Sequence, residues 1–190
     1  QKFIHIKEEI ENTIERLNKI HDKDGGIRGV PTGFSGIDNI LSGLQPSDLI
    51  LLGARPSVGK TTLALDIARN AAISGAAVGV FSIEMSREQI MDRFVSGQAQ
   101  VPLWKLRTGK LNLKDGLEFT LIQQALDELS KLAIYVDDTP SPSILHVRGM
   151  ARRLQLEHKL DLLVIDYLQL IQPRNANTSP VQQVTEISRG

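Results

Sequence analysis

The residues with the clearest chemical potential form one short run that ends in Gly-Lys-Thr. The run is Ala54-Arg55-Pro56-Ser57-Val58-Gly59-Lys60-Thr61, and Thr62 comes next. An aliphatic stretch precedes it and an alanine-rich stretch follows it, which is the strand–loop–helix context of a phosphate-binding loop. Backbone N–H groups of such a loop, together with the helix N-terminus, form a nest for anions. We therefore predict that residues 54–62 bind the phosphates of a nucleoside triphosphate.

Within this run, three positions carry separate roles. Lys60 can reach the β- and γ-phosphates as a point charge, and the Thr61 hydroxyl can ligate Mg²⁺. Gly59 is needed because a side chain there would collide with the phosphates. The usual pattern opens with glycine, whereas this sequence has Ala54, with Gly53 just before it. The alternative is a chance match in an ordinary strand–turn–helix, and the flanking elements argue against it.

Two acidic residues that follow predicted strands can complete a phosphoryl-transfer site. Asp166 follows the apolar residues 162–165, where a buried charge is costly unless a cation such as Mg²⁺ balances it. We assign it to support the metal together with Thr61. Glu84 follows residues 80–83 and could accept a proton from the attacking water or orient that water. The alternatives are a helix cap for Asp166 and an ordinary surface glutamate for Glu84.

Several other polar groups are interpreted as structural. Asp137 and Asp138 also end a predicted strand, but Thr139-Pro140 follow directly, which favours turn capping over metal binding. Trp104 is interpreted as core or interface packing rather than as a platform for base stacking. A predicted helix carries basic residues that we interpret as a solvated face rather than a DNA contact: Arg148, Arg152 and Arg153, with His146 and His158.

The elements that must position these residues alternate along the chain. Continuous aliphatic stretches predict buried strands at residues 49–53, 77–83, 133–136 and 162–165. Helical patterns occupy residues 34–44, 60–74, 86–98, 117–131 and 144–158, and another helix begins near Val181 after a polar loop at 172–180. This alternation predicts an α/β fold with a mainly parallel sheet flanked by helices.

An amphipathic helix is predicted ahead of this α/β core, over residues 4–21. Its apolar positions recur three or four residues apart and line one stripe: Ile6, Ile10, Ile14 and Leu17. A glycine-rich break follows, so residues 1–26 form a linker helix and hinge, and residues 27–190 form the main domain. The stripe either packs on its own domain or docks in a groove of a neighbouring copy.

The composition excludes several classes of site. The 190 residues contain no cysteine, so disulfides, thiolate zinc sites and cysteine nucleophiles are absent. The formal net charge is zero, so nucleic-acid binding requires a local patch or a contact formed between subunits. No apolar run approaches the roughly 20 residues that span a bilayer. We expect a soluble protein of the cytoplasm with no membrane partner.

Several stretches, in order, resemble the C-terminal ATPase domain of replicative DNA helicases of the DnaB type. They are Pro31-Thr32-Gly33-Phe34 with Ile37-Asp38 and Gly43-Leu44, then residues 54–61, 81–86, 106–109, 137–140 and 165–171. The resemblance covers nearly the whole chain. The Ala-Arg-Pro-Ser form of the phosphate loop is typical of this family, so Ala54 supports the assignment. The Thr-Gly-Phe and Gly-Leu elements alone would be weaker evidence, because KaiC-like and RadA-like ATPases share similar ones.

This resemblance implies a RecA-like P-loop fold assembled as a hexameric ring. ATP and Mg²⁺ would bind between subunits, and single-stranded DNA would thread the channel, with translocation 5′ to 3′. On matching positions, Lys60 and Thr61 resemble the Walker A pair, Asp166 the Walker B acid and Glu84 the catalytic glutamate. Residues 4–21 would dock on the adjacent subunit. Primase and a helicase loader are the further partners that the family implies.

The same resemblance implies that parts of the family's machinery lie outside this chain. These are the N-terminal primase-binding domain, the sensor strand, the DNA-binding loops and the arginine finger, so we expect residues 27–190 to be an incomplete ATPase domain with weak turnover and no unwinding. Two alternatives remain: a RecA- or KaiC-like ATPase in recombination or signalling, and a non-catalytic assembly module. The second is disfavoured by the presence of every predicted site group, namely Lys60, Thr61, Glu84 and Asp166.

Overall fold

The structure, a computed structural model, describes residues 5–6, 10, 13–14, 27–111 and 116–171. The helix predicted at 4–21 falls mostly outside the described residues, as do the loop at 172–180 and the helix from Val181. Three members of the predicted stripe are described and are exposed: Ile6, Ile10 and Ile14. No helix of the described residues is long and apolar enough to cross a membrane.

Parallel strands form the centre of the fold, in the order β2-β1-β3. They are β1 (Val78–Ser82), β2 (Ile134–Asp137) and β3 (Leu162–Asp166). Every residue of β1 is buried, because the strand has a neighbour on each edge and helices on both faces. The strands run in one direction, so their carboxyl ends meet at the same edge of the sheet. The predicted parallel α/β fold is confirmed.

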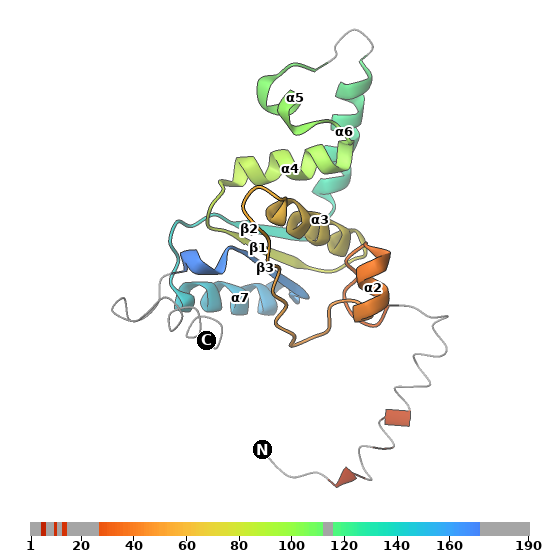
Figure 1. The fold of residues 1–190 in the computed structure, drawn as a ribbon, viewed down its shortest axis with the longest axis vertical. Helices are drawn as coiled ribbons and strands as arrows, with labels where there is room; N and C mark the ends of the chain where they lie inside the picture. Colours follow the sequence, from red (N-terminus) through yellow and green to blue (C-terminus); the bar gives the residue numbers. More distant parts are fainter. Residues whose placement is uncertain (1–4, 7–9, 11–12, 15–26, 112–115, 172–190) are drawn as a thin grey trace.

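Helices cover the two faces of this sheet (Figure 1). On one face lie α3 (Lys60–Ile73) and α4 (Arg87–Ala99), and on the other lies α7 (Ile144–His158). Ala68 and Ala71 of α3 are fully buried in the cluster that includes Val78 and Val80 of β1. Val147 of α7 packs against Phe81 on the opposite face. The alanine-rich face of α3 lets the helix that follows the phosphate loop approach the sheet closely.

A projecting arm extends from α4 and carries α5 (Leu103–Thr108) and α6 (Leu117–Ser130) (Figure 1). Ala99, Val101 and Ala125 form its own small core, with Leu106 packed against it. Of the two predicted environments of Trp104, packing in the core is wrong, since its exposed fraction is 56%, and packing at an interface stays a prediction. The physical reason is helical geometry: Leu106 is two positions away, on roughly the opposite side of α5, and it is Leu106 that faces the arm's core.

The short helix α2 (Ser35–Leu41) is held by a buried carboxylate. The Asp38 side chain accepts hydrogen bonds from Thr32 N at 2.9 Å, Thr32 Oγ1 at 2.8 Å and Gly33 N at 3.1 Å. Asn70 of α3 donates to the Thr32 carbonyl at 3.0 Å. This network ties the Thr-Gly-Phe turn to α3, and the helix is shorter than predicted because Ser42 adopts a left-handed conformation, with φ of 56°.

The predicted first strand at residues 49–53 is not formed, so this prediction was wrong. Leu49, Ile50, Leu51 and Leu52 are irregular in conformation and have exposed fractions of 65%, 49%, 74% and 41%. A run of aliphatic residues favours a strand, but a strand exists only where a neighbour takes up its backbone N–H and C=O groups. Among the described residues, the sheet contains only β2, β1 and β3, and this segment pairs with none of them.

Candidate nucleotide-binding site

One carboxylate joins the start of α3 to the end of β3. Lys60 and Thr61 open α3, and Asp166 is the last residue of β3. Lys60 Nζ lies 2.9 Å from Asp166 Oδ1, and Thr61 Oγ1 donates to Asp166 Oδ2 over 2.5 Å. Only 6% of Asp166 is exposed, and a carboxylate this buried is costly unless its charge is paired. Three of the site residues predicted from sequence are therefore brought into direct contact.

The loop before α3 is open to solvent. Residues 53–59 are all exposed. Gly59 precedes the helix with φ of 108°, a backbone conformation that residues other than glycine rarely adopt. A Cβ on Gly59 would meet nothing within 4 Å. The glycine is therefore required by the backbone, and the space above it is free for a ligand. An accessible loop that leads into a helix of 14 residues fits the binding of phosphate.

The oxygen ligands at this junction suit Mg²⁺. The Thr61 hydroxyl and the Asp166 carboxylate are hard donors of the kind that this ion prefers. In the part of the chain that the structure describes, no cluster of three or more His, Cys, Asp or Glu could hold a metal by itself. A metal here would depend on these two groups together with phosphate oxygens and water, which is the usual way that Mg²⁺ binds in nucleotide sites.

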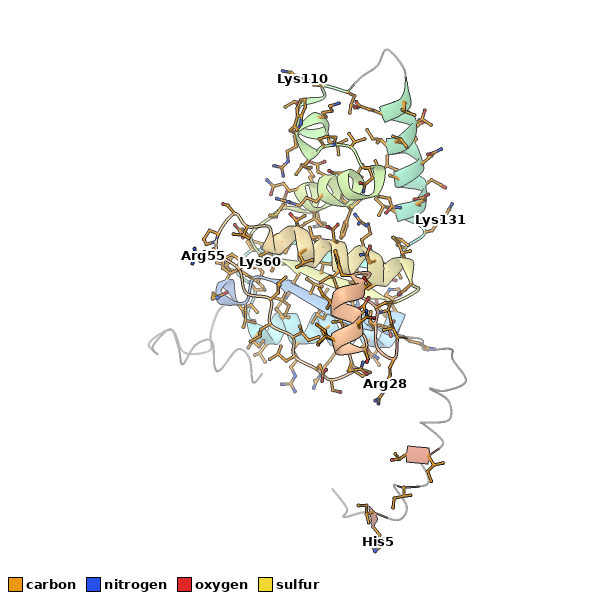
Figure 2. The ribbon with its side chains drawn as sticks, turned by 45° about the vertical axis from the view of Figure 1, so that its right-hand side comes forward. His5, Arg28, Arg55, Lys60, Lys110 and Lys131 are labelled. Carbon is orange, nitrogen blue, oxygen red and sulfur yellow. The ribbon has the colours of Figure 1, made fainter. Side chains whose placement is uncertain are left out.

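Tyr167 is a member of this junction that the sequence analysis did not identify. Its ring centroid lies 4.3 Å from Lys60 Nζ, which is a cation–π contact. The signal that could have found it is its position directly after Asp166. Lys60 lies on the same side of the molecule as Arg55, whose side chain points outward (Figure 2).

Glu84 lies at the same edge of the sheet as Asp166. Ser82 of β1 is opposite Asp166 of β3, and Ile83 N donates to the Asp166 carbonyl at 2.9 Å. Glu84 follows directly, in the bend before α4, and it is exposed. Among the described residues it has no hydrogen-bond or ion-pair partner, so its carboxylate is available to solvent.

Ser86 caps α4, and the cap fixes where the bend that carries Glu84 ends. The Ser86 side chain accepts from Gln89 N, and the Gln89 side chain accepts from Ser86 N, which forms a capping box. Further along α4, Arg93 Nη1 donates to Thr62 Oγ1 at 3.0 Å. This contact between α4 and the first turn of α3 could not be read from sequence spacing, because it depends on how two helices pack.

Asp137 caps a turn, as predicted, whereas Asp138 bonds to Arg87 at the start of α4. Asp137 accepts from Thr139 N at 2.8 Å in a turn, and Asp138 accepts from Arg87 N at 3.1 Å and Arg87 Nε at 2.7 Å. Burial raises the pKa of Asp137, but the hydrogen bonds from Thr139 and the nearby His146 imidazole outweigh it and hold that pKa below its usual value. The Arg87 backbone N–H lowers the pKa of Asp138. Both carboxylates are therefore stabilised as anions without a metal.

The arginines of α7 lie on a solvated face, as predicted. Those arginines are exposed: Arg148, Arg152 and Arg153. Arg153 pairs with Glu157 one turn away at 2.8 Å. His158 stacks on Tyr135 with ring centroids 4.3 Å apart. His146 differs from the prediction, because its Nε2 is buried and lies 3.6 Å from Asp137 Oδ2.

The parallel sheet and the phosphate-binding loop define a RecA-like P-loop ATPase domain. Within this class, the chain belongs to the DnaB-like helicase C terminal domain family, whose family model matches residues 29–190. It is 44% identical over 189 residues to the replicative DNA helicase DnaB of Geobacillus stearothermophilus, and 41% identical to the replicative DNA helicase DnaC of Bacillus subtilis. These alignments cover 98% of this chain and 41% of each relative, so the chain spans about two-fifths of their length.

Solved structures agree with this assignment. One solved ATPase domain superposes with a TM-score of 0.88 at 28% identity, covering 99% of this chain and 66% of that one. A DnaB-like replicative helicase, described with its interactions with primase, gives a TM-score of 0.83 at 28% identity. The match covers 94% of this chain and 43% of that helicase chain. The alternative of a RecA- or KaiC-like ATPase in recombination or signalling is not favoured by these relatives.

Proposed function

We propose that this chain is the motor domain of an ATP-dependent replicative DNA helicase. It binds ATP through residues 54–62 and hydrolyses it at subunit interfaces of a hexameric ring, which moves 5′ to 3′ on single-stranded DNA during replication. The observation that carries the proposal is the contact of Lys60 and Thr61 with one buried carboxylate, Asp166. Those groups are the cation, the metal-ligating hydroxyl and the acid that phosphoryl transfer requires.

In this mechanism the loop N–H groups and Lys60 hold the phosphates. Lys60 exchanges part of its contact with Asp166 for the β- and γ-phosphate oxygens, while the Tyr167 ring keeps its ammonium group near the loop. Bound Mg²⁺ would neutralise negative charge on the phosphates, held by Thr61 and Asp166. Glu84 orients the attacking water and accepts its proton.

Assembly through the linker helix is supported by two apolar surfaces that lack partners among the described residues. One is the stripe of Ile6, Ile10 and Ile14, exposed by 73%, 50% and 53%. The other is an open groove of about 660 Å³ on α2, lined by apolar residues that include Phe34, Ile37, Ile40 and Leu41. We propose that helix 4–21 of one copy docks on the α2 groove of the next, since a helix with an apolar stripe matches an apolar groove.

The remaining partners follow from the family. Single-stranded DNA would occupy the centre of the ring, and a primase and a helicase loader would bind the assembled helicase. One of the structural relatives is itself described with its interactions with primase. A replication motor of this family acts on DNA in the bacterial cytoplasm, which is therefore the proposed location.

The nucleotide site is tested by calorimetric titration of the chain with ATP and Mg²⁺. Lys60→Ala should remove measurable binding, because it deletes the cation of the loop. Lys131→Ala, an exposed lysine paired with Asp127 on α6, is the matched control and should bind as the wild type does. Binding that survives Lys60→Ala would overturn the assignment of residues 54–62.

The helicase assignment is tested on the complete protein that contains this domain. With ATP, it should displace a strand from forked DNA that carries a free 5′ tail, and it should fail on a fork with only a 3′ tail. Ile40→Asp in the α2 groove should prevent ring assembly in sedimentation experiments, whereas Leu156→Asp, on an 87% exposed residue of α7, should not. Failure to unwind the 5′-tailed fork would contradict the proposal.

A further inference from the structure

We infer that Arg93 is a positioning residue for phosphate binding, acting through the hydroxyl of Thr62. The inference rests on the proposed nucleotide site and adds a residue of α4 to it. Arg93 Nη1 donates to Thr62 Oγ1 at 3.0 Å. Thr62 directly follows Thr61 in the first turn of α3, so this bond reaches the start of the helix on which the phosphates are proposed to sit.

The chemistry of a hydroxyl explains what this bond does. A threonine hydroxyl has one proton to donate and two lone pairs that accept. Because Arg93 occupies a lone pair, the proton of Thr62 remains free for another acceptor. Thr62 is exposed, and within the described residues no other hydrogen bond engages its side chain. The bond thus orients the hydroxyl as a donor, and a phosphate oxygen at the loop is the acceptor that fits.

The charge of Arg93 strengthens this effect. No carboxylate pairs with Arg93 among the described residues, in contrast to Arg69, whose Nη1 lies 3.1 Å from Asp66 Oδ1. A donor that carries an unneutralised charge makes a stronger hydrogen bond and polarises the hydroxyl that accepts it. Thr62 therefore becomes a better donor to an anion.

A second observation points to an incomplete environment around the same guanidinium group. Arg93 Nε is buried and has no hydrogen-bond partner in the described part of the chain. A buried donor without a partner is unfavourable, and such groups are rare in folded proteins. Arg69 Nε is in the same state, so what distinguishes Arg93 is that no carboxylate among the described residues balances its charge. An anionic ligand at the start of α3 would supply the missing negative charge.

The position of Arg93 also connects the two sides of the proposed site. Arg93 lies on α4, whose capped first turn begins just after Glu84. Thr62 lies on α3, which begins with Lys60. The Arg93–Thr62 bond is therefore a direct link between the helix that follows the proposed catalytic glutamate and the helix that holds the phosphates.

The test is a double-mutant cycle on ATP affinity. A fluorescent ATP analogue is titrated with Mg²⁺ into the wild-type chain and four variants: Arg93→Met, Arg93→Lys, Thr62→Val and the Met–Val double variant. Methionine keeps an apolar stem but donates no hydrogen bond, and lysine keeps a charged donor. Arg153→Met, on the solvated face of α7, is the matched control. Thermal unfolding of each variant reports whether it remains folded.

We expect Arg93→Met and Thr62→Val each to weaken binding by about two- to tenfold, the effect of one hydrogen bond. The double variant should bind the ATP analogue with the same affinity as Thr62→Val, because Arg93 acts through the Thr62 hydroxyl. Arg93→Lys should restore part of the affinity, and Arg153→Met should change nothing. A merely structural arginine would lower the unfolding temperature without this pattern.

Three results would overturn the inference: unchanged affinity in Arg93→Met, losses that multiply in the double variant, or no rescue by lysine. If Arg93→Met does not fold, Arg93→Gln, a neutral donor, replaces it, and affinity equal to the wild type would again count against the inference. Failure of the nucleotide site itself looks different, because the wild-type chain would then not bind ATP or Lys60→Ala would bind normally, and both proposals would fall together.

Discussion

Thr61 and Asp166 are separated by 105 positions in the chain, and yet Thr61 Oγ1 donates to Asp166 Oδ2 over 2.5 Å. The other oxygen of the same carboxylate lies 2.9 Å from Lys60 Nζ. One side chain at the end of β3 therefore holds both functional groups at the start of α3. In the proposed function, phosphate would compete with Asp166 for Lys60, whereas Mg²⁺ would be held by Thr61 and Asp166 together, so Asp166 would affect both ligands.

Asp166→Asn should uncouple ATP binding from magnesium. The amide keeps the shape of the side chain but loses the charge that supports the metal, so the gain in ATP affinity on adding Mg²⁺ should fall by about tenfold or more. Binding without metal should persist, because Lys60 no longer pairs with a carboxylate. Calorimetry with Mg²⁺ and with a chelator measures both. Asp127→Asn, on the exposed pair with Lys131, is the control, and an unchanged magnesium effect in Asp166→Asn would contradict the prediction.

Glu84→Gln should abolish turnover and leave ATP binding intact in the complete protein. Glutamine matches glutamate in size but cannot accept the proton of the attacking water, so the rate should fall by about 10² to 10⁴. The position of Glu84 in a bend, without a partner among the described residues, implies little effect on folding. Steady-state hydrolysis and nucleotide titration separate the two outcomes. Glu88→Gln, at an exposed position in the first turn of α4, should hydrolyse ATP normally. If both variants hydrolysed ATP at the same rate, Glu84 would have no catalytic role.

Gly29→Ala should destabilise the domain by about 1–3 kcal/mol, the usual cost of overpacking. A Cβ at this position would lie 2.3 Å from the Leu44 carbonyl oxygen and 2.6 Å from its carbon, so the bridge between Val30 and Leu44 would have to open. Urea unfolding measures the effect. Gly149→Ala in α7 is the matched substitution, where a Cβ meets nothing within 4 Å and about 0.5–1 kcal/mol should be gained. If Gly29→Ala were as stable as the wild type, the Leu44 backbone would move aside without cost, which would contradict the prediction.

The ionised carboxylate of Asp137 should stabilise the folded chain, and this stabilisation should be lost in acid. Its pKa in the folded chain lies below the ordinary value of 3.8, so its contribution is complete above that value and disappears as the pH falls through the folded pKa. Asp137→Asn should therefore give a shallower fall of the unfolding free energy below about pH 4. Urea unfolding at neutral and at acid pH measures this slope. Parallel slopes in the variant and the wild type would mean that Thr139 and His146 do not favour the ionised form of Asp137 in the folded chain.

The sequence by itself determined the class of fold and the chemistry available to the site. The phosphate-loop motif is contiguous, so residues 54–62 could be recognised without any tertiary contact. Asp166 and Glu84 could be assigned to one edge of the sheet because parallel strands bring their carboxyl ends together. That Lys60, Thr61 and Asp166 touch agrees with this reasoning, and their roles toward ATP and Mg²⁺ remain predictions.

The tertiary structure decided which groups meet across elements. Hydrophobic periodicity identifies the buried face of a helix but not the helix that packs on it, so the bond between Arg93 and Thr62 could not be foreseen. The same limit explains why the aliphatic residues 49–53 were expected in a strand: composition favours the strand, but pairing with a neighbour creates it. Local sequence thus specified the reactive groups, and packing between α3, α4 and β3 set the contacts through which they act.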